Sequence, residues 1–101
     1  MKFLVIGLPK HPIPPEQLPM VTDGALAWYQ RYEQKFGSFG VFPGGGGFGT
    51  VEVADEKELN QLIIEMPFSW FSEITVRPYV EGAAGFEQLK TAVDSMAAAI
   101  A

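Results

Sequence analysis

Glu52 and Arg77 are the two charged side chains that the sequence pattern best places for chemistry. Apolar residues alternate with polar ones in the segments 50–53 and 73–77, as in strands with one buried face. If the apolar residues face a core, both charged groups lie on the opposite face. There an arginine can bind a carboxylate through paired hydrogen bonds, and a glutamate can act as a general base. The competing interpretation is a structural ion pair or two solvated residues.

Three further residues would share that face and contact a bound carboxylate: Thr50, Thr75 and Tyr79. His11 is the only histidine, and it lies in a proline-rich segment that could cover the mouth of a cavity. An imidazole readily exchanges a proton near neutral pH, so His11 is a second catalytic candidate. A surface histidine with no catalytic task is the alternative.

The segment FPGGGGFGTVEV contains a match to a phosphate-binding pattern. Gly44, Gly46 and Gly49 satisfy GxGxxG. That motif requires a helix after the glycines, because the helix N-terminus binds the anion. Here a strand pattern follows at 50–53, and glycines also supply the positive φ angles of hairpin turns. The sequence therefore predicts a hairpin and no nucleotide site.

Composition excludes several classes of function. The 101 residues carry 12 acidic and 7 basic side chains, for a formal net charge of -5, which disfavours nucleic-acid binding. Cysteine is absent, which excludes zinc–thiolate and iron–sulfur sites. We expect no metal and no cofactor. A heme-dependent oxygenase on the same fold would be a third function, in which only His11 could bind the iron. The apolar start ends at Pro9 without a small-residue cleavage site, so we expect a cytoplasmic protein with no membrane partner.

The pattern along the chain predicts alternating strands and helices. The expected elements are a strand at 2–8, a proline-rich loop at 9–19, a helix from Thr22 or Asp23 to Phe36 ended by Gly37, strands at 38–42 and 48–54, a helix at 55–66, an edge strand within 71–82 and a helix at 85–101. Asp55 and Glu58 have capping-box spacing. On the first helix, Trp28, Tyr29 and Tyr32 could line an aromatic pocket, although their spacing favours core packing.

This order, β-α-β-β-α-β plus a terminal helix, predicts an α+β, ferredoxin-like fold with a four-stranded antiparallel sheet. The chain would be a single domain, 1–101, with a core at 1–81 and a C-terminal helix at 82–101. The second and fourth strands should be the sheet edges, since they adjoin or contain Pro43 and Pro78.

Two helices cover only one face of such a sheet, yet neither face of the first strand is polar. The second face would carry Phe3 or Leu4 and Ile6, with further aromatic residues from other strands. Exposed apolar patches of that kind mark interfaces. We expect two copies to pack sheet on sheet as a homodimer or larger homo-oligomer. The alternative is that the C-terminal helix folds back over its own sheet.

The segment GGGGFGTVEVADEKELNQLIIEMPFSWFSEITVRPYV resembles the muconolactone isomerase family of the dimeric α+β barrel group. MPFSWFSEITV looks like the family's Leu-Pro-aromatic-aromatic segment before the last strand, and MKFLVIGLP fits its opening. The resemblance implies a homo-oligomer that binds a small organic acid between subunits and moves a proton between carbons. At the start of the first helix the family has a Lys/Glu-rich stretch. VTDGALAW stands there in this sequence, so no catalytic residue is carried over.

Two functions therefore stay open. The first is a small-molecule-binding homo-oligomer of the muconolactone isomerase-like type, a cofactor-free isomerase acting on a small organic acid. The second is a non-catalytic structural or interaction module on the same fold, which the missing Lys/Glu-rich stretch and the Ala-rich terminal helix favour.

Overall fold

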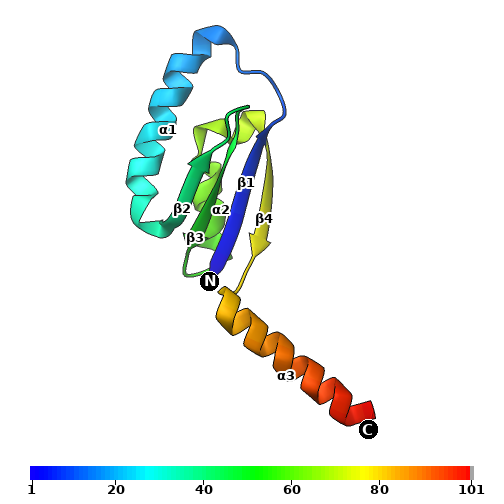
Figure 1. Cartoon of the computed structure of the whole chain (residues 1–101). Helices are drawn as coiled ribbons and strands as arrows, with labels where there is room; N and C mark the ends of the chain where they lie inside the picture. The colour runs from blue at the N-terminus through cyan, green and yellow to red at the C-terminus, as the bar shows by residue number, and fades with distance from the viewer. Residues whose placement is uncertain (101) are drawn as a thin grey trace.

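The computed structural model describes residues 1–100, which form one antiparallel sheet, two helices on one of its faces, and a third helix that projects away (Figure 1). The strands are β1 (Lys2–Pro9), β2 (Phe36–Val41), β3 (Gly47–Glu52) and β4 (Ser72–Pro78). The helices are α1 (Leu18–Tyr32), α2 (Glu56–Ile64) and α3 (Gly82–Ile100), with short 3-10 turns η1 (Pro15–Gln17), η2 (Glu33–Lys35) and η3 (Pro67–Phe71). The predicted α+β, ferredoxin-like element order is confirmed.

The sheet has the strand order β2-β3-β1-β4, with every neighbouring pair antiparallel. The two edge strands are therefore β2 and β4, as predicted. Pro78 is the last residue of β4, which is an edge strand. A proline, which has no N–H to donate, is tolerated at such an edge.

The strand register separates two faces of the sheet. Phe3 pairs with Val51, and Val5 pairs with Val76 on the other side, so these residues share the face that α1 and α2 cover. Leu4 pairs with both Thr50 and Arg77 on the opposite face. We call this second face the open face, because no helix of residues 1–100 covers it (Figure 1).

The core lies between the covered face and the helices. Its buried members are Phe3, Trp28, Val51, Val53, Leu59 and Leu62. The indole Nε1 of Trp28 donates a hydrogen bond of 2.9 Å to the carbonyl oxygen of Leu62, so α1 and the end of α2 are joined by a buried polar contact. Trp28 is thus part of the core, as its helical spacing predicts.

The glycine run forms the turn of the β2–β3 hairpin. Gly45 and Gly46 have φ angles of 101° and 84°, which residues with a Cβ rarely adopt. The chain enters β3 directly afterwards, and no helix follows the glycines. The prediction of a hairpin in place of a phosphate loop is confirmed.

The predicted limits of the first helix are wrong at both ends. α1 begins at Leu18, before the expected cap. Pro19 is accepted in the first turn because backbone N–H groups there have no hydrogen-bond partner within the helix. Thr22 lies inside the helix and donates its hydroxyl to the Leu18 carbonyl at 2.8 Å. At the other end Phe36 already belongs to β2, and Gly37 is a strand residue with no positive φ.

The N-terminus of α2 carries the predicted cap. A side-chain oxygen of Asp55 accepts a 2.8 Å hydrogen bond from the Glu58 N–H, and Glu58 Oε2 accepts one of 2.9 Å from the Ala54 N–H. Glu58 Oε1 also lies 2.6 Å from Lys35 Nζ. This one carboxylate therefore links α2 to the turn η2 that precedes β2.

α3 does not fold back over the sheet. It leaves the end of β4 and points away from the body of the molecule (Figure 1). None of its residues is buried. The alternative in which this helix covers its own sheet is therefore not observed.

The Asp55→Ala variant should lower the free energy of unfolding by about 1 kcal/mol, because the Glu58 amide loses its acceptor. Asp55→Asn retains an acceptor and should lose much less. Urea denaturation at neutral pH measures both, with Asn60→Ala as a control at an exposed position within α2. Equal losses for Asp55→Ala and Asp55→Asn would show that the cap does not stabilise the fold.

Stability should fall in acid partly through Glu58. Its hydrogen bonds to Lys35 and to the Ala54 amide lower its pKa from the ordinary 4.5. A carboxyl whose pKa is lower in the folded state stabilises the fold above the unfolded-state pKa, and that contribution disappears as the pH falls through the folded value. Between pH 6 and 3, Glu58→Gln should therefore lose less urea stability than the unmodified protein. Glu56→Gln is the control, and a Glu58→Gln curve parallel to the unmodified one would contradict this assignment.

Candidate functional site

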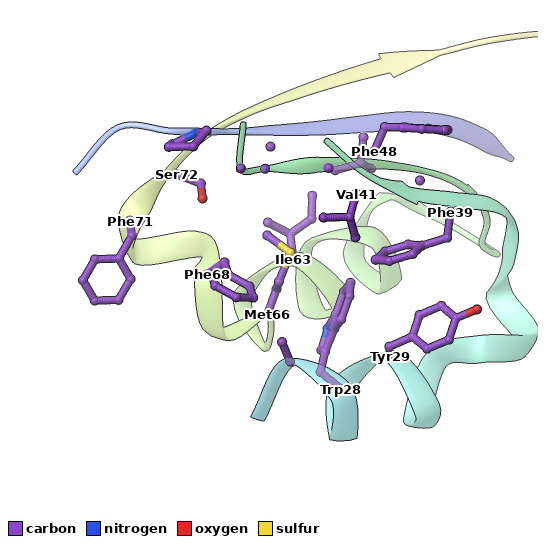
Figure 2. A pocket seen from close by; sticks show the side chains of 18 of the residues that line it. Trp28, Tyr29, Phe39, Val41, Phe48, Ile63, Met66, Phe68, Phe71 and Ser72 are labelled. Atoms are coloured by element: carbon purple, nitrogen blue, oxygen red, sulfur yellow. The ribbon is translucent and has the colours of Figure 1, made fainter. Parts of the chain in front are cut away.

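A cavity of about 590 Å³ lies between the covered face of the sheet, α1 and η3 (Figure 2). This volume falls within the range of about 300–1,000 Å³ found for small-molecule sites. The cavity is formed by a single copy of the chain and is partly open to the surroundings. It is therefore a different place from the intersubunit cavity that the sequence predicts on the open face.

Glycines on the covered face leave room for this cavity. Gly7 of β1 pairs with Gly47 of β3, and the neighbouring Val5 pairs with Gly49. All three glycines line the cavity. Strand residues at these positions would ordinarily project side chains toward the helices. Here glycine backbone forms part of the wall at Gly7 and Gly47, while the rings of Phe36 and Phe39 lie over Gly49, 3.1–3.4 Å from where a Cβ would stand.

Aromatic side chains form the wall on the side of α1 and β2. Trp28 and Tyr29 project from α1, and Phe36 and Phe39 come from β2. The ring centroids of Tyr29 and Phe39 are 4.7 Å apart, and those of Trp28 and Phe36 are 5.4 Å apart. The register of β2 shifts between Phe36 and Phe39, so both rings reach the same face although three positions separate them.

The opposite wall comes from the end of α2 and from η3. Ile63 lies in the last turn of α2, and Met66 lies between α2 and η3. Phe68 and Phe71 belong to η3, the 3-10 turn that Pro67 opens (Figure 2). These side chains are apolar, like those of the first wall. A ligand in the cavity would therefore be held mainly by burial of apolar surface.

Few polar side chains reach the cavity, and none carries a permanent charge. The lining residues include no Asp, Glu, Lys or Arg. Ser72 directs its hydroxyl oxygen from the end of the sheet toward the helical layer (Figure 2). His11 lines the cavity from the proline-rich segment, and its backbone N–H donates to the Phe71 carbonyl at 3.1 Å. The segment that carries the imidazole is thus attached to η3.

The structure places the predicted open-face residues together, away from this cavity. Leu4 pairs with Thr50 on one side and with Arg77 on the other. Glu52 pairs with Lys2, two residues before Leu4 on the same face. Glu52, Thr75 and Arg77 are exposed, while Thr50 is half-buried. None of them lines the cavity, so the expected grouping of His11 with Glu52 and Arg77 around one space does not occur within a single chain.

Neighbouring groups already engage part of the open face. The Thr50 hydroxyl oxygen accepts a 2.8 Å hydrogen bond from the Ser38 N–H, which ties β3 to β2. Lys2 Nζ lies 2.6 Å from Glu81, and this hydrogen bond raises the pKa of Lys2 above its ordinary 10.5. Tyr79, just beyond β4, is half-buried and donates its backbone N–H to the Lys2 carbonyl at 3.1 Å.

Sequence reasoning missed the position of the cavity, although two signals for it were present. Gly7 stands in an otherwise apolar strand, and Gly47 and Gly49 stand at alternate positions of its hairpin partner. The sequence also offers Trp28, Tyr29 and Tyr32 as residues of an aromatic pocket. Trp28 and Tyr29 line the cavity, and Tyr32 does not. The pairing of Gly7 with Gly47 became apparent only from the register of β1 and β3.

Two classes of site have no candidate among the described residues. In residues 1–100 no three His, Asp or Glu side chains cluster closely enough to bind a metal ion. No helix in that part of the chain has the length and apolar character required to span a membrane.

Comparison with known proteins identifies a structural relative. No family model matches the sequence, and no curated protein matches it. Among solved structures, 5-chloro-2-hydroxyhydroquinone dehydrochlorinase from Burkholderia phenoliruptrix AC1100, in complex with 2,5-dihydroxybenzoquinone, superposes with a TM-score of 0.65. The two sequences are 19% identical, and the match covers 83% of this chain and 98% of the other. The likeness confirms the ferredoxin-like α+β fold that the sequence predicts.

Proposed function

We propose that this protein binds a small, uncharged ring compound in the cavity between its sheet and α1. The observation that supports this most directly is the composition of the wall. Aromatic and aliphatic side chains surround the space, and no charged side chain is among them. A flat ring can pack against such walls and remove apolar surface from water.

The absence of charge in the lining also indicates which ligands are disfavoured. A carboxylate moved into this space would lose its hydration without gaining a cationic partner, which costs several kcal/mol. Hydroxyl or carbonyl substituents on a ring would be accommodated, since Ser72 and His11 offer hydrogen-bonding groups. The ligand bound to the structural relative, 2,5-dihydroxybenzoquinone, is a ring with oxygen substituents, which supports a ring-shaped ligand, while the preference for an uncharged one rests on the lining residues alone.

Gly7→Val should test the cavity directly. A Cβ at this position would meet only the terminal Cδ1 of Ile74, at 3.3 Å. The flexible Ile74 side chain can move by the few tenths of an ångström that this contact requires. The new methyl groups would occupy ligand space, while a β-branched residue suits a strand. We expect hydroquinone to bind the unmodified protein, benzoate to bind at least tenfold more weakly, and Gly7→Val to weaken hydroquinone binding at least tenfold. Calorimetric titration measures all three.

Leu8→Ile is the matched control for Gly7→Val. It introduces β-branching at the next residue of the same strand, where the side chain lies on the open face. Hydroquinone affinity should be unchanged in this variant, and both variants should keep the thermal unfolding midpoint of the unmodified protein. Equal hydroquinone binding by Gly7→Val and the unmodified protein would place the ligand elsewhere. Binding of benzoate more tightly than hydroquinone would contradict the uncharged ligand class.

A second candidate function uses the open face. Here a homodimer of the muconolactone isomerase-like type would pack sheet against sheet and enclose Arg77 and Glu52 between two copies. Arg77 would bind the carboxylate of a small organic acid, assisted by Thr50, Thr75 and Tyr79. Glu52 would take a proton from one carbon and return it to another, and His11 would relay protons only if a partner copy brought it near. The strand pairing places Arg77, Thr50 and Glu52 on the same face of the sheet, which supports this candidate.

Arg77→Gln separates the two candidates. If the open face binds the acid, this variant should weaken binding of a small dicarboxylate such as muconate at least tenfold, while hydroquinone binding stays unchanged. Glu52→Gln should retain muconate binding, and with muconolactone, which has an acidic C–H beside its carbonyl, it should lose proton exchange at carbon, measured as deuterium incorporation by NMR. Muconate affinity that does not respond to Arg77→Gln would remove the open-face site. A folded protein that binds neither hydroquinone nor muconate would favour a non-catalytic interaction module.

A further inference from the structure

α3 carries an apolar stripe that no other described part of the chain covers. The side chains at alternating intervals of three and four residues are Phe86, Leu89, Val93, Met96 and Ile100. Their exposed fractions lie between 52% and 85%. The helix projects into the surroundings, away from the sheet (Figure 1). In proteins most of the stability of a helix comes from packing its apolar face, and the apolar residues of α3 gain nothing until they pack.

Outside the stripe α3 consists of alanines and glycines together with a polar segment at 87–95, in which acidic groups outnumber basic ones. Lys90 Nζ lies 3.8 Å from Asp94, one turn further along, and Glu87 adds a second carboxylate. The whole chain has a formal net charge of -5. Helices that lie on anionic membranes are instead rich in Lys and Arg. The charge therefore favours a protein partner over a lipid surface.

We propose that α3 pairs with the α3 of a second copy of this chain through its apolar stripe. Spacing of three and four residues is the a/d pattern of two-stranded coiled coils, in which side chains of one helix fit between those of the other. On one flank of the stripe stand Gly85, Ala92 and Ala99, seven residues apart. Such small side chains allow helix axes to approach to about 8 Å.

The area that this pairing removes from water is sufficient for a weak contact. Five large apolar side chains on each of two helices, all more than half exposed, would bury on the order of 1,000 Å² in total. That is below the roughly 1,200–2,000 Å² of stable interfaces and within the range of weak, transient ones. A weak, concentration-dependent dimer is the expected result, unless other surfaces add to it.

A second α3 fits this stripe better than the open face of the sheet does. The open face presents the exposed charges of Glu52, Glu73 and Arg77 on both sides of the half-buried Leu4 and Ile6. An apolar helix laid across them would bury charges without partners, which is unfavourable. An identical stripe carries no charge within it, so pairing two stripes avoids this cost.

Cysteine cross-linking tests the pairing in the full-length protein, because the natural sequence contains no cysteine. Under mild oxidation, Val93→Cys should form a covalent dimer on a non-reducing gel, since facing stripe positions lie within disulfide distance. Thr91→Cys, on the polar side of α3, is the matched control and should not. Phe86→Cys cross-linked to itself indicates a parallel pair, and Phe86→Cys cross-linked to Ile100→Cys an antiparallel one. No cross-linking above the Thr91→Cys level at any of these stripe positions overturns the proposal.

Oligomeric state provides an independent measurement. Sedimentation equilibrium should show a reversible dimer whose dissociation constant rises at least tenfold in the Leu89→Glu/Met96→Glu variant. Gln88→Glu/Ser95→Glu adds the same charges at the same spacing outside the stripe and should leave dissociation unchanged. The thermal midpoint of the sheet core should not change in either variant, because α3 buries none of its side chains against it. Equal dissociation constants for both double variants, or a monomeric unmodified protein at millimolar concentration, would contradict the pairing.

Discussion

The candidate binding site depends on one packing constraint: bulky side chains around its rim hold the helical layer away from a stretch of sheet that is largely glycine. Gly7 and Gly47 face each other across β1 and β3, and Gly49 follows on the same face. The aromatic residues of α1 and β2 span the layer on one side of these glycines, and the end of α2 and η3 span it on the other. Protein interiors are normally close-packed, so a gap of this size departs from ordinary core packing.

The two faces of the sheet have different chemistry. The covered face holds an apolar cavity, whereas the open face combines Leu4 and Ile6 with exposed charges such as Glu52 and Arg77. The uncharged-ring proposal concerns the first face, and the organic-acid proposal concerns the second. Association through α3 involves neither face. The three proposals can therefore be tested separately, and the failure of one leaves the other two standing.

Much of the fold could be predicted from the sequence, because its signals are local. The cap at Asp55, the hairpin at Gly45 and Gly46, and the edge position of Pro78 each depend on residues a few positions apart. The limits of α1 were predicted wrongly because two local signals competed. Prolines that usually exclude a helix are accepted in its first turn, and an aromatic residue at helical spacing, Phe36, belongs instead to a strand.

The sequence by itself determined the element order, the edge strands, the face shared by Thr50, Glu52, Thr75 and Arg77, and the apolar stripe of α3. Alternation and helical periodicity are properties of neighbouring residues, and they survive without knowledge of partners. Only the tertiary structure decided where the cavity lies and that α3 stands away from the sheet. Both depend on which distant residues meet: the pairing of Gly7 with Gly47 is set by strand register, and the direction of α3 is set by where β4 ends.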